Sequence, residues 1–182
     1  MRRMAILALA IMALALLTGC PFESDVPLGA PGPGSLDPKL LGAWTSTDET
    51  GSVADVEFIP FNKYEYYVEL REEGKGQPER YRAYTVKVGD QPFLNISELK
   101  QETAPATFYF ARYSVSKEGV LALHLVGDQG IPKDLAKDQK ALVKFVAAHL
   151  KGTVLDDSER PVLMRRPAPD SKPAAGKAPS KP

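Results

Sequence analysis

Alternation of apolar and polar side chains between residues 53 and 126 constrains the fold of this chain more than any other feature. Within residues 63–72, Tyr64, Tyr66, Val68 and Leu70 occupy every second position, and the positions between them are mostly charged. A period of two places successive side chains on opposite faces of a β-strand. The pattern therefore predicts a strand with one face toward a core and the other toward water.

Several further runs show the same pattern and are bounded by turn-forming residues. We expect strands at 53–61, 79–89, 93–99, 107–115 and 120–126, and a short last strand at 161–164. Within 79–89, Tyr84, Val86 and Val88 are expected to face inward. Residues 116–119, Ser-Lys-Glu-Gly, predict the turn of a β-hairpin.

One segment breaks the period of two. In residues 132–150, Leu135, Leu142, Val146 and Leu150 follow the spacing of one helical face, and lysines lie mostly on the other side. Pro132 suits a first helical turn, and Gly152 stands where a C-terminal cap is expected. The sequence predicts a single amphipathic helix before the last strand.

Both ends of this region differ from it in composition. Residues 20–35 are rich in proline and glycine, which disfavours a helix or a central strand, so we expect a tether that could extend to roughly 45 Å. Residues 167–182 contain proline, alanine, lysine and serine and have little to bury, so disorder is expected. Residues 36–166, roughly 130 residues, are enough for one domain of ordinary size.

The N-terminus has the layout of an export signal. Arg2 and Arg3 precede fourteen apolar residues, 4–17, which are followed by the small residues Thr18 and Gly19. Fourteen helical residues at ~1.5 Å each cannot cross a hydrocarbon core of ~30 Å. Residues 1–19 are therefore predicted to be a cleaved signal peptide rather than a permanent transmembrane helix.

Residues 17–20, Leu-Thr-Gly-Cys, resemble the lipobox of bacterial lipoproteins. This resemblance implies that Cys20, the single cysteine of the chain, becomes the lipidated N-terminus and anchors the protein in a membrane. Pro21 follows it where an aspartate would favour the inner membrane, so the outer membrane, facing the periplasm, is the implied location. The alternative is an ordinary secreted protein with a cysteine at its cleavage site.

The segment Gly42-Ala43-Trp44 resembles the opening signature of lipocalin-like (calycin) barrels. The resemblance implies a mainly β fold: a single antiparallel barrel of about eight strands, with one α-helix before the last strand. In this family the helix follows the eighth barrel strand, and a late arginine packs against the tryptophan. By position, Arg165 or Arg166 could be the partner of Trp44, and Arg165 is our choice.

The chain offers little for catalysis, metal binding or nucleic-acid binding. His124 and His149, the two histidines, lie in a predicted strand and near the end of the predicted helix, where structural roles explain them. Their spacing and the lack of a cysteine pair predict no metal site, and no cofactor motif is present. The chain is neutral overall, while residues 1–19 and 167–182 carry +2 each, so residues 20–166 carry −4 and disfavour nucleic acid.

Aromatic residues recur in the predicted strands, and core packing explains them well. A ligand site would also suit them, with Tyr66, Tyr84 and Phe110 as possible pocket lining. We therefore expect a non-catalytic, lipid-anchored envelope protein that binds either a small apolar or amphipathic ligand or an envelope protein partner. An enzyme of unknown reaction and a purely structural lipoprotein are the alternatives.

Overall fold

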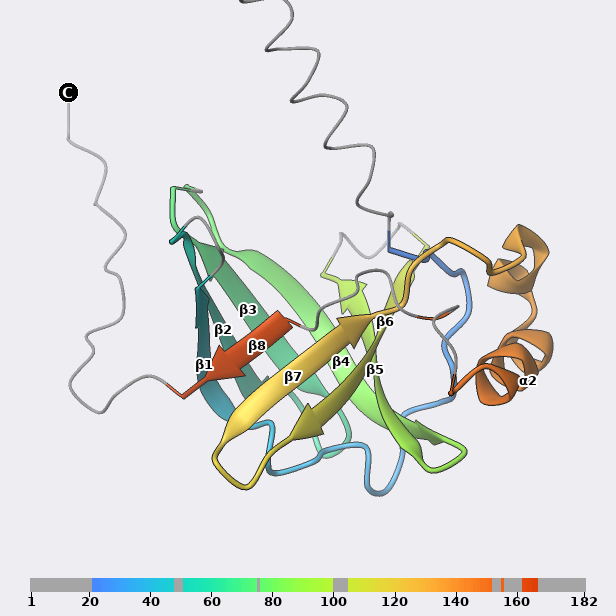
Figure 1. Ribbon diagram of the computed structural model, residues 1–182, viewed down its shortest axis with the longest axis horizontal. Helices are drawn as coiled ribbons and strands as arrows, with labels where there is room; N and C mark the ends of the chain where they lie inside the picture. Colours follow the sequence, from blue (N-terminus) through green and yellow to red (C-terminus); the bar gives the residue numbers. More distant parts are fainter. Residues whose placement is uncertain are drawn as a thin grey trace, which may run out of the picture.

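The computed structural model describes residues 21–47, 51–74, 76–99, 105–151, 155 and 162–166. The predicted signal peptide 1–19, Cys20, Gly152 and the predicted tail 167–182 lie outside the described residues. Within these ranges the fold is mainly β, as predicted: eight antiparallel strands form one closed barrel, and one α-helix precedes the last strand (Figure 1).

The barrel has simple up-and-down topology. Its strands are β1 Gly42–Thr47, β2 Val53–Pro60, β3 Tyr66–Glu72, β4 Glu79–Val88, β5 Gln91–Glu98, β6 Phe108–Val115, β7 Val120–Leu125 and β8 Val162–Arg165. Each strand pairs with the next one, and Thr45 of β1 pairs with Arg165 of β8 to close the barrel. This pairing joins the first strand to the last, so the described strands form one closed sheet. All of the predicted strands are confirmed to within a few residues.

The predicted helical segment is divided into two pieces. A 3-10 helix, η1 Lys133–Lys137, is followed by the α-helix α2 Gln139–Ala148. Asp138 lies between them with extended backbone, and its Oδ1 accepts a hydrogen bond of 3.0 Å from the Ala141 N–H. An aspartate N-cap satisfies an amide that would otherwise lack a partner, so it begins a new helix at this point.

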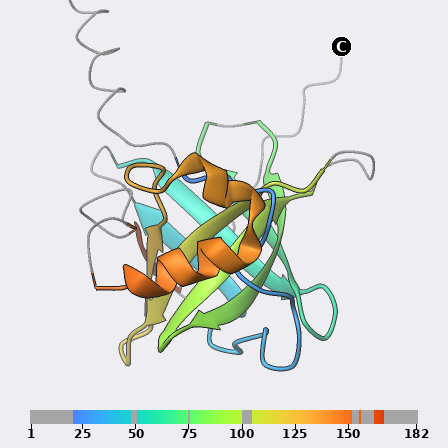
Figure 2. The same ribbon diagram turned by 90° about the vertical axis from the view of Figure 1, so that its right-hand side faces the viewer.

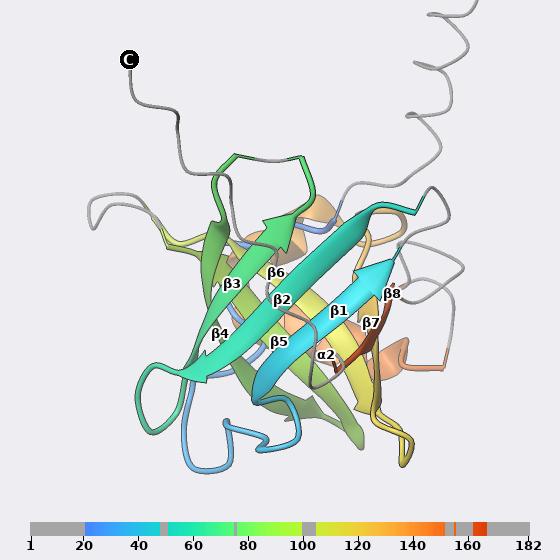
Figure 3. The ribbon, with the colours of Figure 1, turned by 90° about the vertical axis from the view of Figure 1, so that its left-hand side faces the viewer.

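The position of α2 departs from the calycin layout. The helix follows β7 rather than an eighth barrel strand, and β8 is itself part of the barrel. It covers one side of the barrel (Figure 2), whereas the side formed by β1, β2 and β3 carries no described helix (Figure 3). The outer face under α2 is therefore buried, whereas the outer face of β1, β2 and β3 is not covered by a described helix.

The buried apolar residues form two clusters on opposite sides of the barrel wall. The interior cluster lies inside the barrel and includes Trp44, Phe58, Tyr66, Leu94, Ala111, Leu121 and Met164. The outer cluster lies between the outer face of β4–β6 and α2 and includes Phe22, Leu28, Val88, Phe93, Phe110, Leu142 and Val146. The expectation that Tyr84, Val86 and Val88 face inward is wrong. Their side chains point to the outer face of β4, where the residues around the outer cluster cover them.

Residues 21–35, which we call the strap, do not form the predicted tether. The strap runs across β6, β5 and β4 beside α2, visible as the blue trace in Figure 1. Pro21 and Ser24 form β-bridges to Gly127 and Phe108 at its start, and the Thr85 N–H donates to the Ser35 carbonyl at its end, over 2.9 Å. Proline and glycine exclude regular structure here, but three apolar residues dock instead: Phe22, Val26 and Leu28.

Candidate functional site

The three aromatic residues predicted to line a pocket lie on two different sides of the wall. Tyr66 belongs to the interior cluster, and its ring contacts that of Phe58 edge-on at 5.6 Å. Tyr84 and Phe110 lie on the outer face, under the strap and α2. The structure therefore does not bring Tyr66, Tyr84 and Phe110 together in one site.

Trp44 closes the end of the barrel at which β1, β3, β5 and β7 begin, which we call the closed end. Trp44 is fully buried, and its Nε1 donates to the Leu40 carbonyl over 2.7 Å. The guanidinium of Arg166, not that of Arg165, lies 4.4 Å from the centroid of the Trp44 ring. Arg165 is the wrong choice. It is the last residue of β8 and pairs with Thr45 of β1, and the next residue, Arg166, is the one that contacts the ring.

Gly42 explains the spacing of the Gly-x-Trp segment. Its φ is +99°, which favours glycine, and a Cβ at this position would lie 2.9 Å from Nη1 of Arg166. Arg166 also donates to the carbonyls of Leu41 and Lys39, over 2.9 and 3.1 Å. The glycine therefore provides the space through which the arginine reaches both the backbone and the tryptophan.

Asp37 and two tyrosines fill the closed end from inside. The Tyr113 hydroxyl donates to Oδ2 of Asp37 over 3.1 Å, and the Tyr66 hydroxyl donates to the Asp37 carbonyl over 3.0 Å. Burial raises the pKa of Tyr66 and of Tyr113, and the Asp37 charge adds to the rise at Tyr113. Both phenols are therefore neutral at pH 7, and this end is packed with satisfied polar groups.

The opposite end of the barrel, at which β2, β4 and β6 begin, is the open end. Apolar side chains that pack on the interior cluster at this end are only partly buried: Leu70, Tyr81, Ile96, Leu123 and Leu125. At the closed end Leu36, Leu41 and Val115 are partly buried in the same way. Among the residues that the structure describes, the open end leaves part of its apolar interior surface exposed.

Two tyrosines place hydroxyl groups at this apolar surface. Tyr81 donates to Oε2 of Glu79 over 2.5 Å, and Tyr109 donates to Oε1 of Glu23 over 3.2 Å. Burial raises both pKa values, and the neighbouring glutamates raise them further, Glu79 for Tyr81 and Glu23 for Tyr109. An apolar wall with a few polar groups near its rim is typical of a site for small amphipathic ligands.

A groove of about 870 Å³ lies between the end of the strap and the turn from β4 to β5. Asp37 and Thr85 are among its polar lining residues. Both are already engaged, Asp37 with Tyr113 and Thr85 with the Ser35 carbonyl over 3.1 Å. The groove therefore has fewer polar groups available for a ligand than its lining suggests.

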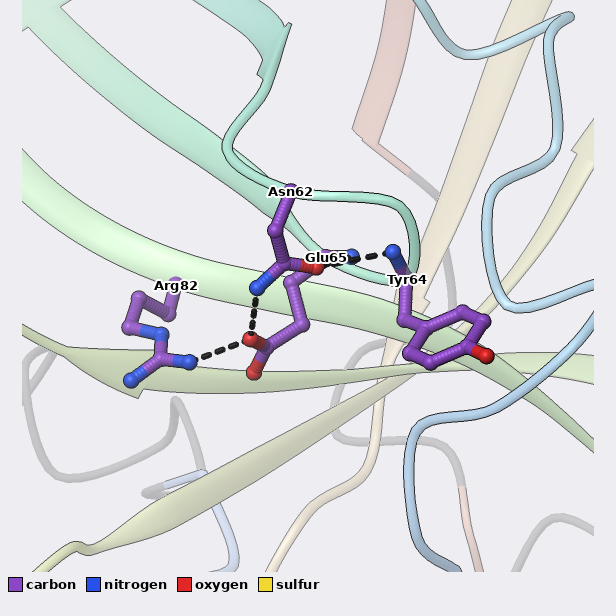
Figure 4. Close-up of polar contacts among 4 residues, drawn as sticks. All are labelled: Asn62, Tyr64, Glu65 and Arg82. Atoms are coloured by element: carbon purple, nitrogen blue, oxygen red, sulfur yellow. Dashed lines mark hydrogen bonds and ion pairs between the residues drawn. The ribbon is translucent and has the colours of Figure 1, made fainter.

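A buried carboxylate lies in the loop from β2 to β3 (Figure 4). Glu65 is paired with Arg82 and accepts a hydrogen bond of 2.6 Å from Nδ2 of Asn62. Oδ1 of Asn62 in turn accepts from the N–H groups of Tyr64 and Glu65, over 2.8 and 3.0 Å. These contacts stabilise a tight turn, and both polar groups of the Asn62 side chain are hydrogen-bonded within it. The cluster therefore has a structural role in the loop rather than a catalytic one.

Neither histidine lies in a polar cluster. His124 pairs with Arg112 across β7 and β6. His149 caps α2, with Nδ1 2.8 Å from the Phe145 carbonyl and its ring stacked on that of Phe145. Within the described ranges, no group of three or more histidine, cysteine or acidic residues could hold a metal ion.

Sequence reasoning did not find the residues that hold the strap. Asn95 is 1% exposed, and its Oδ1 accepts from the Leu28 N–H over 2.7 Å. Tyr84 donates to the Gly29 carbonyl over 2.7 Å, and Oγ of Ser24 donates to the Ala136 carbonyl over 3.0 Å. One signal was present: an asparagine within the apolar run 93–96 has to be hydrogen-bonded if it is buried.

No protein-family model, no curated protein and no solved structure matches this chain. Among the helices that the structure describes, none is long and apolar enough to cross a membrane.

Proposed function

We propose that this chain is a cell-envelope lipoprotein, anchored through Cys20 in the outer membrane and facing the periplasm. Its lipocalin-like barrel binds a small apolar or amphipathic ligand at the open end without catalysing a reaction. The lipobox resemblance supports the anchor. The ligand site is supported by one observation: partly exposed, inward-facing apolar side chains lie at the open end beside the hydroxyl groups of Tyr81 and Tyr109.

The resemblance to calycins has partial support. The contact of Arg166 with the Trp44 ring agrees with it. The position of α2 after the seventh strand departs from it. We therefore propose a lipocalin-like use of the barrel on the basis of its closed and open ends.

Binding at the open end can be tested with a matched pair of substitutions. Ile96 and Ser97 are adjacent in β5, so their side chains point to opposite faces of the wall. In the purified chain without its signal peptide, Ile96→Trp should weaken binding of the apolar fluorescent probe N-phenyl-1-naphthylamine by at least ~10-fold. Ser97→Trp should leave it unchanged. Equal binding by both variants, with unfolding midpoints like that of the parent, would rule out an interior site at this end.

The natural ligand class requires protein from its own cells. Native mass spectrometry of that protein should show a retained small molecule, which Ile96→Trp should displace. Replacement of Cys20 by serine tests the anchor separately, since it should leave an uncleaved or unlipidated precursor.

A protein partner is the second candidate, because two large apolar side chains are exposed on the side without a helix. Ile59 and Phe61 are 41% and 53% exposed, and both follow the outer-face parity of β2. The guanidinium of Arg82 lies 4.9 Å from the centroid of the Phe61 ring. If this surface docks a partner, a cross-link formed in intact cells from a photoreactive residue at position 59 should disappear in Phe61→Ser.

A further inference from the structure

The first residues of the strap are fixed at the open end of the barrel. Pro21 bridges Gly127, which follows the end of β7, and Ser24 bridges Phe108 at the start of β6. Backbone hydrogen bonds join Phe22 N–H to Val126 O over 2.8 Å, and Ser24 to Phe108 in both directions over 3.0 and 2.8 Å. These are isolated β-bridge contacts, and they hold the start of the strap at this end.

Burial of its side chains holds the strap firmly on the barrel wall. Phe22 and Leu28 are 3% and 4% exposed, and Ser24 is 1% exposed with its hydroxyl engaged to the Val26 and Ala136 carbonyls. Freeing the strap would expose both apolar side chains and break these bonds, which opposes detachment. The tether of roughly 45 Å that composition alone suggests is therefore absent from residues 21–35.

The distance from Pro21 to the proposed anchor is set by covalent geometry. Consecutive Cα atoms lie ~3.8 Å apart, so a lipidated Cys20 would insert its acyl chains within one residue of the fixed start of the strap. The closed end is farther away, because β6 contains eight residues and a strand rises ~3.3 Å per residue. The barrel can tilt relative to the membrane. As long as Pro21 stays at the lipid headgroups, the part of the open end next to Pro21 stays there too.

We infer that the open end of the barrel is docked against the surface of the bilayer that holds the anchor, and that the ligand enters the barrel from that bilayer rather than from the aqueous phase. This inference rests on the proposed lipidation of Cys20. The charges at this end are of both signs: Glu23 lies in the strap, and Glu79 and Arg80 of β4 lie beside the end of β3, which carries Arg71. The short link, and not electrostatic attraction, therefore keeps the open end at the membrane.

The docking can be measured after chemical coupling, independently of natural lipidation. The mature chain, residues 20–182, is coupled through Cys20 to a maleimide phospholipid in phosphatidylcholine vesicles that carry a headgroup acceptor dye. A fluorescent amino acid is placed at Leu99, beyond the end of β5 at the open end, or at Lys117, in the turn between β6 and β7 at the closed end. Energy transfer should be at least ~2-fold more efficient from position 99 than from position 117. Equal transfer, or more transfer from position 117, would overturn the docking.

A spacer variant separates the short link from any other cause. Twenty Gly/Ser residues inserted between Cys20 and Pro21, with an r.m.s. length of roughly 25 Å, should reduce the difference between the two positions to near zero. The same segment appended after Pro182 should leave it unchanged. A difference that survives the insertion would show that the link does not orient the barrel. Probe binding in solution is measured separately, so loss of docking and loss of the proposed ligand site give different results.

Ligand entry from the bilayer has its own readout. With the probe loaded in the same vesicles, transfer into the coupled barrel should be at least ~5-fold faster for the direct link than for the spacer variant. Equal rates would overturn entry from the bilayer even if the barrel is docked.

Discussion

The interior cluster and the outer cluster share one wall of the barrel, yet they are assembled differently. Strands close around the interior cluster on all sides, whereas the outer cluster is covered by two separate pieces, the strap and α2. Phe93, Leu94 and Asn95 are all buried because β5 lies between the two clusters. Opening the interior requires breaking the barrel, while the outer cluster can open when a single piece detaches.

The largest expected effect is at the centre of the interior cluster. Trp44→Ala should lower the free energy of unfolding by about 3–5 kcal/mol, because a fully buried aromatic side chain is lost and a cavity remains. Urea denaturation followed by circular dichroism measures it. A loss of unfolding free energy below ~1 kcal/mol would mean that the closed end tolerates a cavity. The interior cluster would then not be harder to disrupt than the outer cluster.

In the outer cluster, Leu142→Ala should cost about 2–4 kcal/mol, since Leu142 is fully buried against the barrel wall. Lys144→Ala is the control, because Lys144 lies on the exposed face of the same helix. Hydrogen exchange should show lost protection in α2 and the strap and near-normal protection in β1–β3. Uniform loss over the whole barrel would indicate one cooperative unit rather than two.

Asn95→Ala removes the acceptor of the buried Leu28 N–H and should cost about 1–3 kcal/mol. The strap should become sensitive to proteolysis before the barrel does, which mass spectrometry of limited digests can show. Ser97→Ala, two positions along on the same face, should behave like the parent chain. Cleavage first within the strands would contradict the view that the strap is a separable piece.

Arg166→Ala should lower stability by about 1 kcal/mol, because the exposed guanidinium makes two backbone hydrogen bonds and one ring contact. Arg165→Ala is the matched control and should change it by less than ~0.5 kcal/mol. Arg166→Lys should restore only part of the loss, since an ammonium cannot reproduce the planar fork. Thermal unfolding midpoints compare the three variants, and a larger loss at Arg165 would reverse the assignment.

The smallest effect is a change in the pH dependence of stability above pH 10. Burial, aided by the Glu65 charge, raises the pKa of Tyr84 to about 12. A raised phenol pKa favours folding below the unfolded value of ~10, and this contribution is lost as pH rises toward 12. Tyr84→Phe should therefore flatten the fall in stability between pH 10 and 12. Urea midpoints at several pH values measure it, and an unchanged slope would indicate that strap contacts do not shield this phenol.

The barrel could be predicted because its signals are local. The alternation in β2, β3 and β6, the turn 116–119 and the helical stripe each depend on a few neighbouring residues. The strap could not, because its contacts join residues far apart, such as Phe22 with Val126 and Leu28 with Asn95. Composition describes residues 21–35 as unable to form regular structure, but it carries no signal that Phe22 and Leu28 find an apolar surface.

The candidate site divides in the same way. Trp44 and a late arginine were predictable from a short motif, but the choice between Arg165 and Arg166 depends on the register of β8 with β1. The separation of Tyr66 from Tyr84 depends on parity in β4, where the adjacent residues Ala83, Tyr84 and Thr85 are all buried. In such strands the apolar pattern no longer indicates which face is inside.

The strap also has a consequence for the order in which the chain acquires structure during synthesis and export. Its partners Asn95, Phe108, Val126 and Ala136 leave the ribosome roughly 70–110 residues after it. The earliest segment of the domain must therefore remain unsatisfied until nearly the whole domain has emerged. Contacts between such distant residues form slowly, and the exposed Phe22 and Leu28 are available to a chaperone in the meantime. A chain interrupted before α2 would keep its N-terminal segment exposed.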